Sequence, residues 1–236
     1  IPDLAFDHDL KYPDALKLIE NLRTRAKEVG VDVLEYQLLF KDNPEPITIP
    51  FPLIIKPLRL GSSIGISIVK EASELSYALD VAFEFDNAVL VEPFINGIKE
   101  YNLAGALSQT GFNFSIIEEP QKEEFLDFDK KYLDFSRTKR VNEANLPLEV
   151  QEAIKTAFVK LYDPLFRGAL IRCDFFVLDH RVYLNEINPI PGSMANYLFD
   201  DFEAVLTALS GSLPTGIEMP PQTYRYIHSI QSAKGK

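Results

Sequence analysis

The chain has 236 residues, of which 46% are hydrophobic and 11% aromatic, so it can bury the core of one large domain or two small ones. Its formal net charge of −11 argues against a nucleic-acid-binding surface and a basic membrane patch, although a few local cations would suffice for a nucleotide phosphate. One cysteine, no apolar run of membrane-spanning length and an N-terminus without a secretory signal pattern together predict a cytoplasmic protein.

The first fifty residues predict a helix, a strand and a linker. Apolar residues recur at helical spacing over 13–29, and Gly30 supplies a typical helix end. Residues 31–40 predict one strand, and the proline-rich stretch 41–50 is a plausible domain boundary. We therefore expect residues 1–50 to form an N-terminal helix, strand and connector.

The apolar segment 51–57 predicts a buried strand that contains one lysine, Lys56. A lysine in such a strand is costly unless its ammonium group meets an anion. The sequence GSSIG follows at 61–65, and its backbone N–H groups and hydroxyls can close over phosphates. Alone, such a loop is more often a plain turn, but the nearby lysine favours a phosphate site that includes Ser62, Ser63 and Gly65.

A second apolar strand over 88–95 contains groups suited to a purine nucleoside. The Glu92 carboxylate could accept a hydrogen bond from an exocyclic amine, and backbone groups near Phe94 and Ile95 could bond the base edge. Glu100 could bind ribose hydroxyls, although a solvent-facing strand residue is the plainer interpretation.

The most polar region, residues 118–145, mixes charged residues with aromatic ones. A loop of this length in a compact domain is usually a lid or an insert, and its cations could reach a γ-phosphate. A solvated basic face is the alternative. Hydrophobic periodicity predicts the remaining elements, which are helices over 71–85, 147–162 and 196–209 and a hairpin over 101–117.

The stretch 168–193 predicts two short apolar strands joined by a tight turn. Side chains alternate along a strand, so Arg172 shares a face with Asp174, and Glu186 shares one with Asn188. If the strands pair, their oxygen donors lie together and suit Mg²⁺, which prefers carboxylates, water and phosphate oxygens. The alternative is a solvated acidic hairpin, and the separate phosphate signal upstream argues against it.

Four segments, read together, resemble a known family. They are FPLIIKP…GSSIGISIVK, VEPFINGIKEYNLAG, EFLDFDKKYLDFS and IRCDFF…YLNEINPIPGS, spread over about residues 51–210. Their order and spacing are similar to the central and C-terminal domains of D-alanine–D-alanine ligases, which belong to the ATP-grasp superfamily. The resemblance implies an α+β ATP-grasp fold in which two α+β subdomains with mostly antiparallel sheets clasp the nucleotide. We expect these subdomains at 51–107, with the phosphate loop and adenine hinge, and at 108–236, with the lid and the magnesium site.

The resemblance also implies a reaction and a set of site residues. Two D-alanines would be joined through an acyl phosphate, with ATP and Mg²⁺ (or Mn²⁺), to give D-alanyl-D-alanine for peptidoglycan. The expected partners are ATP and D-alanine, with no nucleic acid or membrane, and a homodimer is left open. The implied ATP-binding residues are Lys56, Ser62, Ser63, Gly65, Glu92, Phe94, Ile95, Glu100 and Lys131. The implied magnesium ligands are Asp174, Glu186 and Asn188. Arg172 and the Gly192 N–H would stabilise the tetrahedral intermediate, and the implied substrate contacts are Tyr132 of the lid, Tyr197 and Leu198.

Two features keep other functions open. In the family a further domain precedes this region and contributes to the first D-alanine site, whereas residues 1–30 resemble at most its connecting helix. The chain could therefore act as a nucleotide-binding module without ligation. Tyr197 also replaces the usual serine, which leaves open a related ATP-grasp ligase with another amine substrate.

Overall fold

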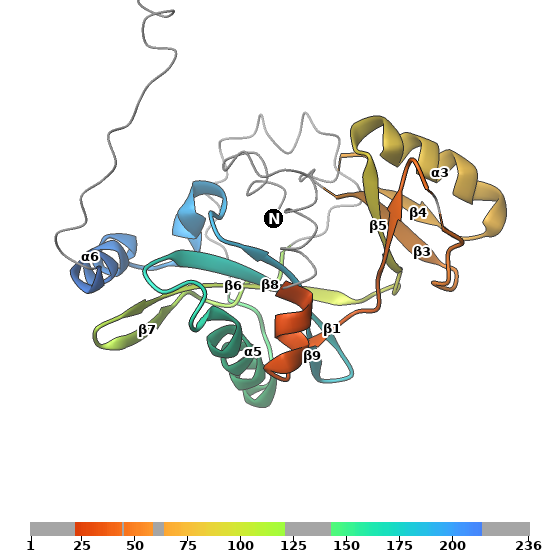
Figure 1. The fold of residues 1–236 in the computed structure, drawn as a ribbon. Coiled ribbons are helices and arrows are strands. Elements are labelled where there is room, and N and C mark those ends of the chain that lie inside the picture. Colours follow the sequence, from red (N-terminus) through yellow and green to blue (C-terminus); the bar gives the residue numbers. More distant parts are fainter. Residues whose placement is uncertain (1–21, 44, 59–63, 121–142, 214–236) are drawn as a thin grey trace, which may run out of the picture.

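The computed structural model describes residues 22–43, 45–58, 64–120 and 143–213. Within these ranges the strands form two sheets, one on each side of the molecule in Figure 1, with strand orders β1-β9-β8-β6-β7 and β2-β5-β3-β4. Neighbouring strands are antiparallel except for β1 and β9, which are parallel. The mixture of helices and mostly antiparallel sheets confirms the predicted α+β class.

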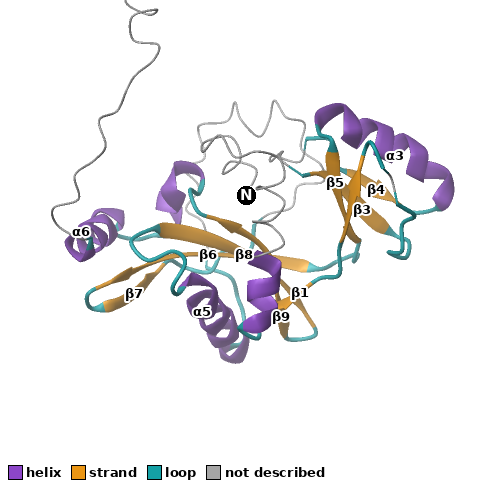
Figure 2. Ribbon diagram, in the orientation of Figure 1, coloured by secondary structure: helices purple, strands orange, loops and turns teal. Residues whose placement is uncertain are grey.

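The four-stranded sheet has one helix packed against it. Its strands are β2 (Gln37–Phe40), β3 (Leu53–Pro57), β4 (Ser67–Val69) and β5 (Ala88–Pro93). Helix α3 (Ala72–Phe85) lies along the outer side of this sheet in Figure 2. Its buried residues Ala78 and Ala82 pack with Leu53, Ile55 and Val91. The four-stranded sheet and α3, here called the small lobe, therefore have a hydrophobic core separate from that of the large lobe, which contains the five-stranded sheet.

The five-stranded sheet packs on a longer helix. Its strands are β1 (Asp32–Val33), β6 (Lys99–Ser108), β7 (Gly111–Phe114), β8 (Leu170–Leu178) and β9 (Arg181–Asn188). Helix α5 (Leu148–Tyr162) and the helix of residues 22–28 share one hydrophobic cluster with this sheet. Inside it, the Tyr162 hydroxyl donates to the Ala169 carbonyl at 2.7 Å and accepts from the Leu107 N–H at 3.2 Å, which satisfies the polar end of a buried ring.

Two short elements complete the fold after β9. The helical turn η1 (Gly192–Leu198) and helix α6 (Phe202–Ser212) replace the single helix predicted over 196–209, so that prediction was wrong. Asp201 causes the break, because its side chain accepts from the Ala204 N–H at 2.9 Å and so begins a new helix.

The predicted strand over 31–40 was also wrong. The chain forms β1 and β2 instead, which pair with β9 and β5 in different sheets. Similarly, β6 lies mostly within the predicted subdomain 51–107, but it pairs with β7 and β8 of the five-stranded sheet. Apolar alternation indicates that a segment is extended but not which sheet it joins.

Local signals were more reliable. The helix of residues 22–28 ends as predicted at Gly30, whose φ is +71°, and the Val31 N–H bonds back to the Ala26 carbonyl at 2.8 Å. The β8–β9 hairpin turns at Asp179 and His180, with φ of 49° and 64°, which is the left-handed backbone that a two-residue hairpin loop needs. Within the described ranges, no helix combines the length and the apolar character needed to cross a membrane.

Candidate nucleotide and metal site

The centre of the site is the β8–β9 hairpin, whose two strands and turn were predicted from the sequence. Arg172 lies opposite Asn188, and Asp174 lies opposite Glu186. A β-bulge follows directly, because the register shifts between Asp174 and Phe175. Bulges of this kind re-aim side chains beside active sites. The structure therefore brings together the four residues that were expected to converge.

Hydrogen bonds join these four side chains into one cluster. The Arg172 guanidinium donates from Nε to Asp174 Oδ1 and from Nη2 to Asp174 Oδ2, both at 2.7 Å. The Asn188 amide donates to Asp174 Oδ2 at 3.0 Å and to Glu186 Oε1 at 3.1 Å. Bidentate contacts between a guanidinium and a carboxylate are the strong form of such pairs. Asp174 is buried, whereas Glu186 reaches solvent, so the cluster runs from the interior to the surface.

The two carboxylates of this cluster titrate as a pair. Burial raises the pKa of Asp174 to about 7 against the opposing hydrogen bonds and charge of Arg172, and the charge of Glu186 raises it further. The packed surroundings of the Glu186 carboxylate also oppose its ionisation, but hydrogen bonds with Asp174 and Asn188 outweigh this effect and lower the Glu186 pKa. Ionising both groups is therefore difficult unless a cation takes the place of a proton.

A further polar residue, Asn102, was missed by sequence reasoning. It lies on β6 directly opposite Asp174 and donates from Nδ2 to Glu118 Oε2 at 3.2 Å. Its Oδ1 is buried and has no hydrogen-bond partner among the described residues. Only the pairing of β6 with β8 could have revealed this neighbour, because Asn102 and Asp174 are 72 positions apart in the sequence.

The donor chemistry of the cluster fits Mg²⁺. Two carboxylates and an amide oxygen are hard ligands, and Mg²⁺ is usually bound through one or two carboxylates plus substrate phosphates. The Asn188 amide here directs Nδ2 to both carboxylates, so it would turn to present its oxygen to a metal. The unsatisfied Asn102 Oδ1 beside Asp174 is a further acceptor for a ligand or its water. In the described ranges no group of three or more His, Cys, Asp or Glu side chains could hold a metal ion, so a fully protein-bound site is not found there.

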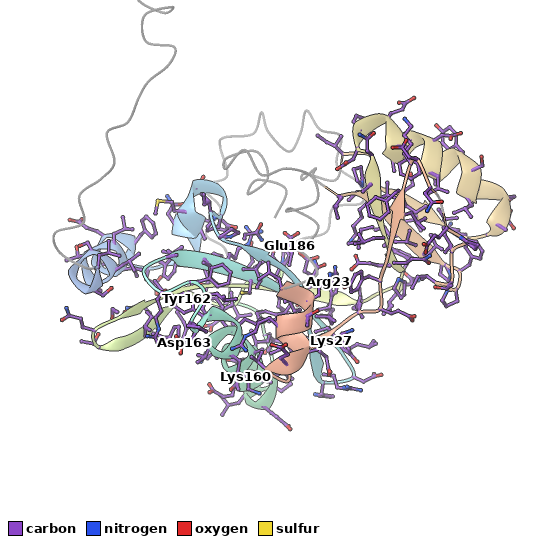
Figure 3. All side chains as sticks on the ribbon, viewed as in Figure 1. Arg23, Lys27, Lys160, Tyr162, Asp163 and Glu186 are labelled. Carbon is purple, nitrogen blue, oxygen red and sulfur yellow. The ribbon has the colours of Figure 1, made fainter. Side chains whose placement is uncertain are left out.

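Lys56, which was expected to meet a phosphate, has the Glu92 carboxylate as its anion in the structure. Lys56 Nζ donates to Glu92 Oε2 at 2.7 Å, and Arg23 Nη2 donates to Glu92 Oε1 at 2.7 Å. Burial opposes ionisation of Glu92, but the charges of Lys56 and Arg23 outweigh it and lower its pKa. Each oxygen of Glu92 thus meets a cation, an arrangement that differs from the predicted hydrogen bond to a purine amine. In Figure 3, Arg23 and Lys27 mark the two ends of their helix, and the end with Arg23 is the one on the side of Glu186.

The residues expected to bind the nucleoside occupy the connection from β5 to β6. The Phe94 N–H donates to the Pro52 carbonyl at 2.9 Å, and the Ile98 N–H donates to the Ile95 carbonyl at 3.3 Å, which shapes this connection. Gly97 makes its turn with φ of +74°. Glu100 lies two residues before Asn102 on β6, so the two side chains share a face.

The η1 turn contains three residues that were predicted to contact the substrate or the intermediate, namely Gly192, Tyr197 and Leu198, and their surroundings differ from one another. Gly192 is exposed at its start, and the next three residues have left-handed backbone, with φ near 52°. Such backbone costs energy for non-glycine residues and is found mainly at functional sites. Tyr197 is exposed, but partial desolvation of its hydroxyl and the charge of Glu118 raise its pKa while Arg172 opposes this, so the hydroxyl lies near the charged cluster. Leu198 is 1% exposed and packs on Ala104, a place in the core that offers no substrate surface.

Comparison with known proteins identifies the family to which the chain belongs. The family model described as D-ala D-ala ligase C-terminus matches residues 26–202, which is three quarters of the chain and includes the whole β8–β9 cluster. The chain belongs to the D-alanine–D-alanine ligase family.

Two comparisons show how close the family likeness is. The D-alanine–D-alanine ligase of Wolinella succinogenes is 61% identical over 213 residues, which cover 89% of this chain and 61% of the relative. The crystal structure of the ligase from Helicobacter pylori is 48% identical, with a TM-score of 0.69, over 82% of this chain and 57% of that one. The chain thus spans about three fifths of the length of the curated ligases that it matches.

A third comparison concerns substrate choice within the fold. VanG D-Ala:D-Ser ligase from Enterococcus faecalis is 27% identical, with a TM-score of 0.65, over 81% of this chain and 60% of that one. The likeness to these ligases confirms the predicted ATP-grasp architecture. Some of the predicted D-alanine–D-alanine ligase residues lie outside the described ranges, namely Ser62, Ser63, Lys131 and Tyr132.

Proposed function

We propose that this chain is the part of a D-alanine–D-alanine ligase that binds ATP and joins two D-alanines into D-alanyl-D-alanine for peptidoglycan. The observation that carries the proposal is the convergence of Arg172, Asp174, Glu186 and Asn188 on paired strands. Family membership supports the reaction class, since the curated relatives bear this name.

In this proposal Asp174, Glu186 and Asn188 hold Mg²⁺, or Mn²⁺, through oxygen atoms. When bound, the metal neutralises phosphate charge and orients the triphosphate. Lys56 binds the phosphates, together with the loop that contains Ser62, Ser63 and Gly65. The lid residues Lys131 and Tyr132 close over the γ-phosphate and the substrate. Backbone groups at Phe94 and Ile95 hold adenine, Glu92 beside them stays paired with Lys56 and Arg23, and Glu100 holds ribose.

The proposed reaction has two steps. The carboxylate of one D-alanine attacks the γ-phosphorus of ATP, ADP leaves, and an acyl phosphate forms. The neutral amine of the second D-alanine then attacks the acyl carbon, phosphate leaves, and the new amide nitrogen loses a proton. No protein nucleophile is required, which agrees with the burial of Cys173 and the raised pKa of its thiol.

Arg172 and Gly192 would stabilise the intermediate of the second step. Attack on the acyl carbon places negative charge on its oxygen, and preorganised donors lower the free energy of that state. Burial lowers the pKa of Arg172, but the hydrogen bonds and charge of Asp174 outweigh it, so the guanidinium stays protonated. Tyr197 lies near Arg172 and would contact the second amino acid.

Two further candidates have specific support. A nucleotide-binding module without ligation needs only phosphate and metal groups, which Lys56 and the cluster of Asp174, Glu186 and Asn188 would supply. A ligase for another amine is favoured by Tyr197 and by the likeness to a protein named a D-Ala:D-Ser ligase.

One experiment separates the three candidates. The 236-residue chain is mixed with ATP and MgCl₂, and phosphate release and dipeptide formation are measured with D-alanine, D-serine plus D-alanine, L-alanine or no amino acid. Dipeptide formation that needs D-alanine and stops with EDTA supports the ligase. ATP binding without any effect of amino acid identifies the module, and a mixed dipeptide formed in preference identifies another amine substrate. Absence of ATP binding would overturn all three.

A further inference from the structure

The carboxylate of Glu92 joins parts of the chain that belong to different cores. Glu92 lies on β5 of the four-stranded sheet, and Lys56 lies on neighbouring β3. Arg23 comes instead from the helix of residues 22–28, whose Leu22 and Ala26 pack in the core of the five-stranded sheet. The Arg23–Glu92 contact thus links the two lobes across 69 positions of sequence.

These three groups have an unbalanced charge. One carboxylate meets two cations at 2.7 Å each, so among the described residues these three groups have a net charge of +1. The side chains are 3% exposed for Glu92, 11% for Arg23 and 24% for Lys56. Burying an excess charge is costly, so such a cluster is explained best by an anion that completes it.

The contacts of Arg23 are already well defined. Its guanidinium lies over the Tyr36 ring, 4.3 Å from the ring centroid, in addition to its bond to Glu92. The more exposed cation is Lys56, whose ammonium is therefore the group nearer to an incoming ligand. Without Arg23, Glu92 would neutralise Lys56 alone, and the cluster would have no charge left for an anion.

We propose that Arg23 is a positioning residue of the nucleotide site, which shares the charge of Glu92 so that Lys56 keeps a free positive charge for the phosphates of ATP. This inference rests on the proposed function, because it takes ATP as the ligand. Arg23 acts through Glu92 and Lys56 and does not itself touch the nucleotide. The competing role is purely mechanical, in which Arg23 only ties the two lobes together.

The two roles of Arg23 predict different changes in the affinity for ligands with and without phosphate. A charge effect changes the affinity for ATP and ADP but leaves that for adenosine nearly unchanged, whereas loss of a lobe contact weakens all three. The measured quantity is the ratio of the adenosine Kd to the ATP Kd, obtained by calorimetry with the 236-residue chain in MgCl₂. We expect Arg23→Gln to lower this ratio about tenfold and Arg23→Lys to keep it within about threefold.

The sharper variant restores the charge without restoring the contact. In Arg23→Gln/Glu92→Gln the carboxylate and one cation are both removed, so Lys56 again has its full charge. We expect the ratio to return to within about threefold of the original. The double variant leaves only the Lys56 ammonium charged, and that side chain is 24% exposed, so the variant can still be measured even if Arg23→Gln alone does not fold.

A matched control lies in the same helix. Arg25 is two residues from Arg23 and pairs with Glu28 at 3.6 Å on the surface, so Arg25→Gln should not change the ratio. An unchanged ratio in Arg23→Gln, or no recovery in the double variant, overturns the inference while the proposed function stands. If the original chain binds neither ATP nor ADP, both the inference and the proposed function are overturned.

Discussion

Gly65 lies directly against the ring of Phe85 at the end of α3. A Cβ at Gly65 would come within 2.7 Å of Phe85 Cδ2 and of Pro57 Cγ, distances that real Cβ atoms do not adopt. Its φ of +70° is also a left-handed conformation that favours glycine. The end of the predicted phosphate loop is thus fixed by backbone conformation and by packing together.

Gly65→Ala should therefore lower the free energy of unfolding by about 2–4 kcal/mol, because left-handed strain and overpacking add. Urea unfolding of the two proteins measures the difference. Gly97→Ala is the matched control, since Gly97 has φ of +74° but open space around its Cβ position, and only the backbone cost remains. Adding Phe85→Ala to Gly65→Ala should recover about 1 kcal/mol. Equal losses in the two alanine variants would show that the ring contact has no effect.

Arg172→Gln should destabilise the chain by about 3 kcal/mol, because it leaves the buried Asp174 carboxylate without its cation. Arg172→Lys keeps the charge but not the two parallel hydrogen bonds, so its loss should be smaller. Urea unfolding measures both. The control is Arg181→Gln, which removes an exposed pair with Asp32 and should have little effect. A loss in Arg172→Gln no larger than in the control would contradict the buried-pair interpretation.

Glu186→Gln should weaken Mn²⁺ binding at least about tenfold, because a carboxylate ligand becomes a neutral amide. Mn²⁺ titration followed by electron paramagnetic resonance, with and without ADP, measures this directly and needs no turnover. The melting temperature should change little, since the glutamine keeps an oxygen acceptor for the Asn188 amide and the side chain reaches solvent. Glu152→Gln on α5, where Glu152 forms an exposed pair with Lys155, serves as the control. Unchanged Mn²⁺ affinity in Glu186→Gln would remove this residue from the metal site.

The sequence predicted this cluster well because its members are close along the chain. Arg172, Asp174, Glu186 and Asn188 lie on one hairpin, where alternation and a tight turn determine the pairing. Asn102 could not be found in the same way, since it joins the cluster through the pairing of β6 with β8. Strand partners of distant segments depend on the packing of whole sheets, which a local pattern does not record.

At Lys56, too, the sequence predicts what depends on one segment but not the contacts with distant segments. The need for an anion follows from the polarity of one segment, and the structure provides one. The identity of that anion follows from the β3–β5 register. Glu92 lies opposite Ile54, which is two residues before Lys56 on β3, so Lys56 and Glu92 lie on the same face of the sheet. The second cation, Arg23, comes from a helix in the other lobe, and no periodicity in either segment indicates that contact.

Glu92 should give the fold a measurable pH dependence. Its pKa is lowered below the ordinary value of 4.5, because the charges of Lys56 and Arg23 outweigh the effect of burial. A lowered pKa in the folded state means that the stabilisation is present above the unfolded-state pKa and is lost as the pH falls through the folded-state pKa. The free energy of unfolding of the original chain should thus be about 3 kcal/mol larger than that of Glu92→Gln at pH 7, and this difference should shrink progressively below about pH 4.5.

Urea unfolding of both proteins at several pH values from 7 to 3 measures the difference. Ser115→Ala, which removes a buried hydroxyl that bonds the Ala104 N–H at 2.9 Å, should show a cost that does not vary with pH. An advantage over Glu92→Gln that stays constant down to pH 3, or grows, would mean that the carboxylate is not held ionised by its two cations.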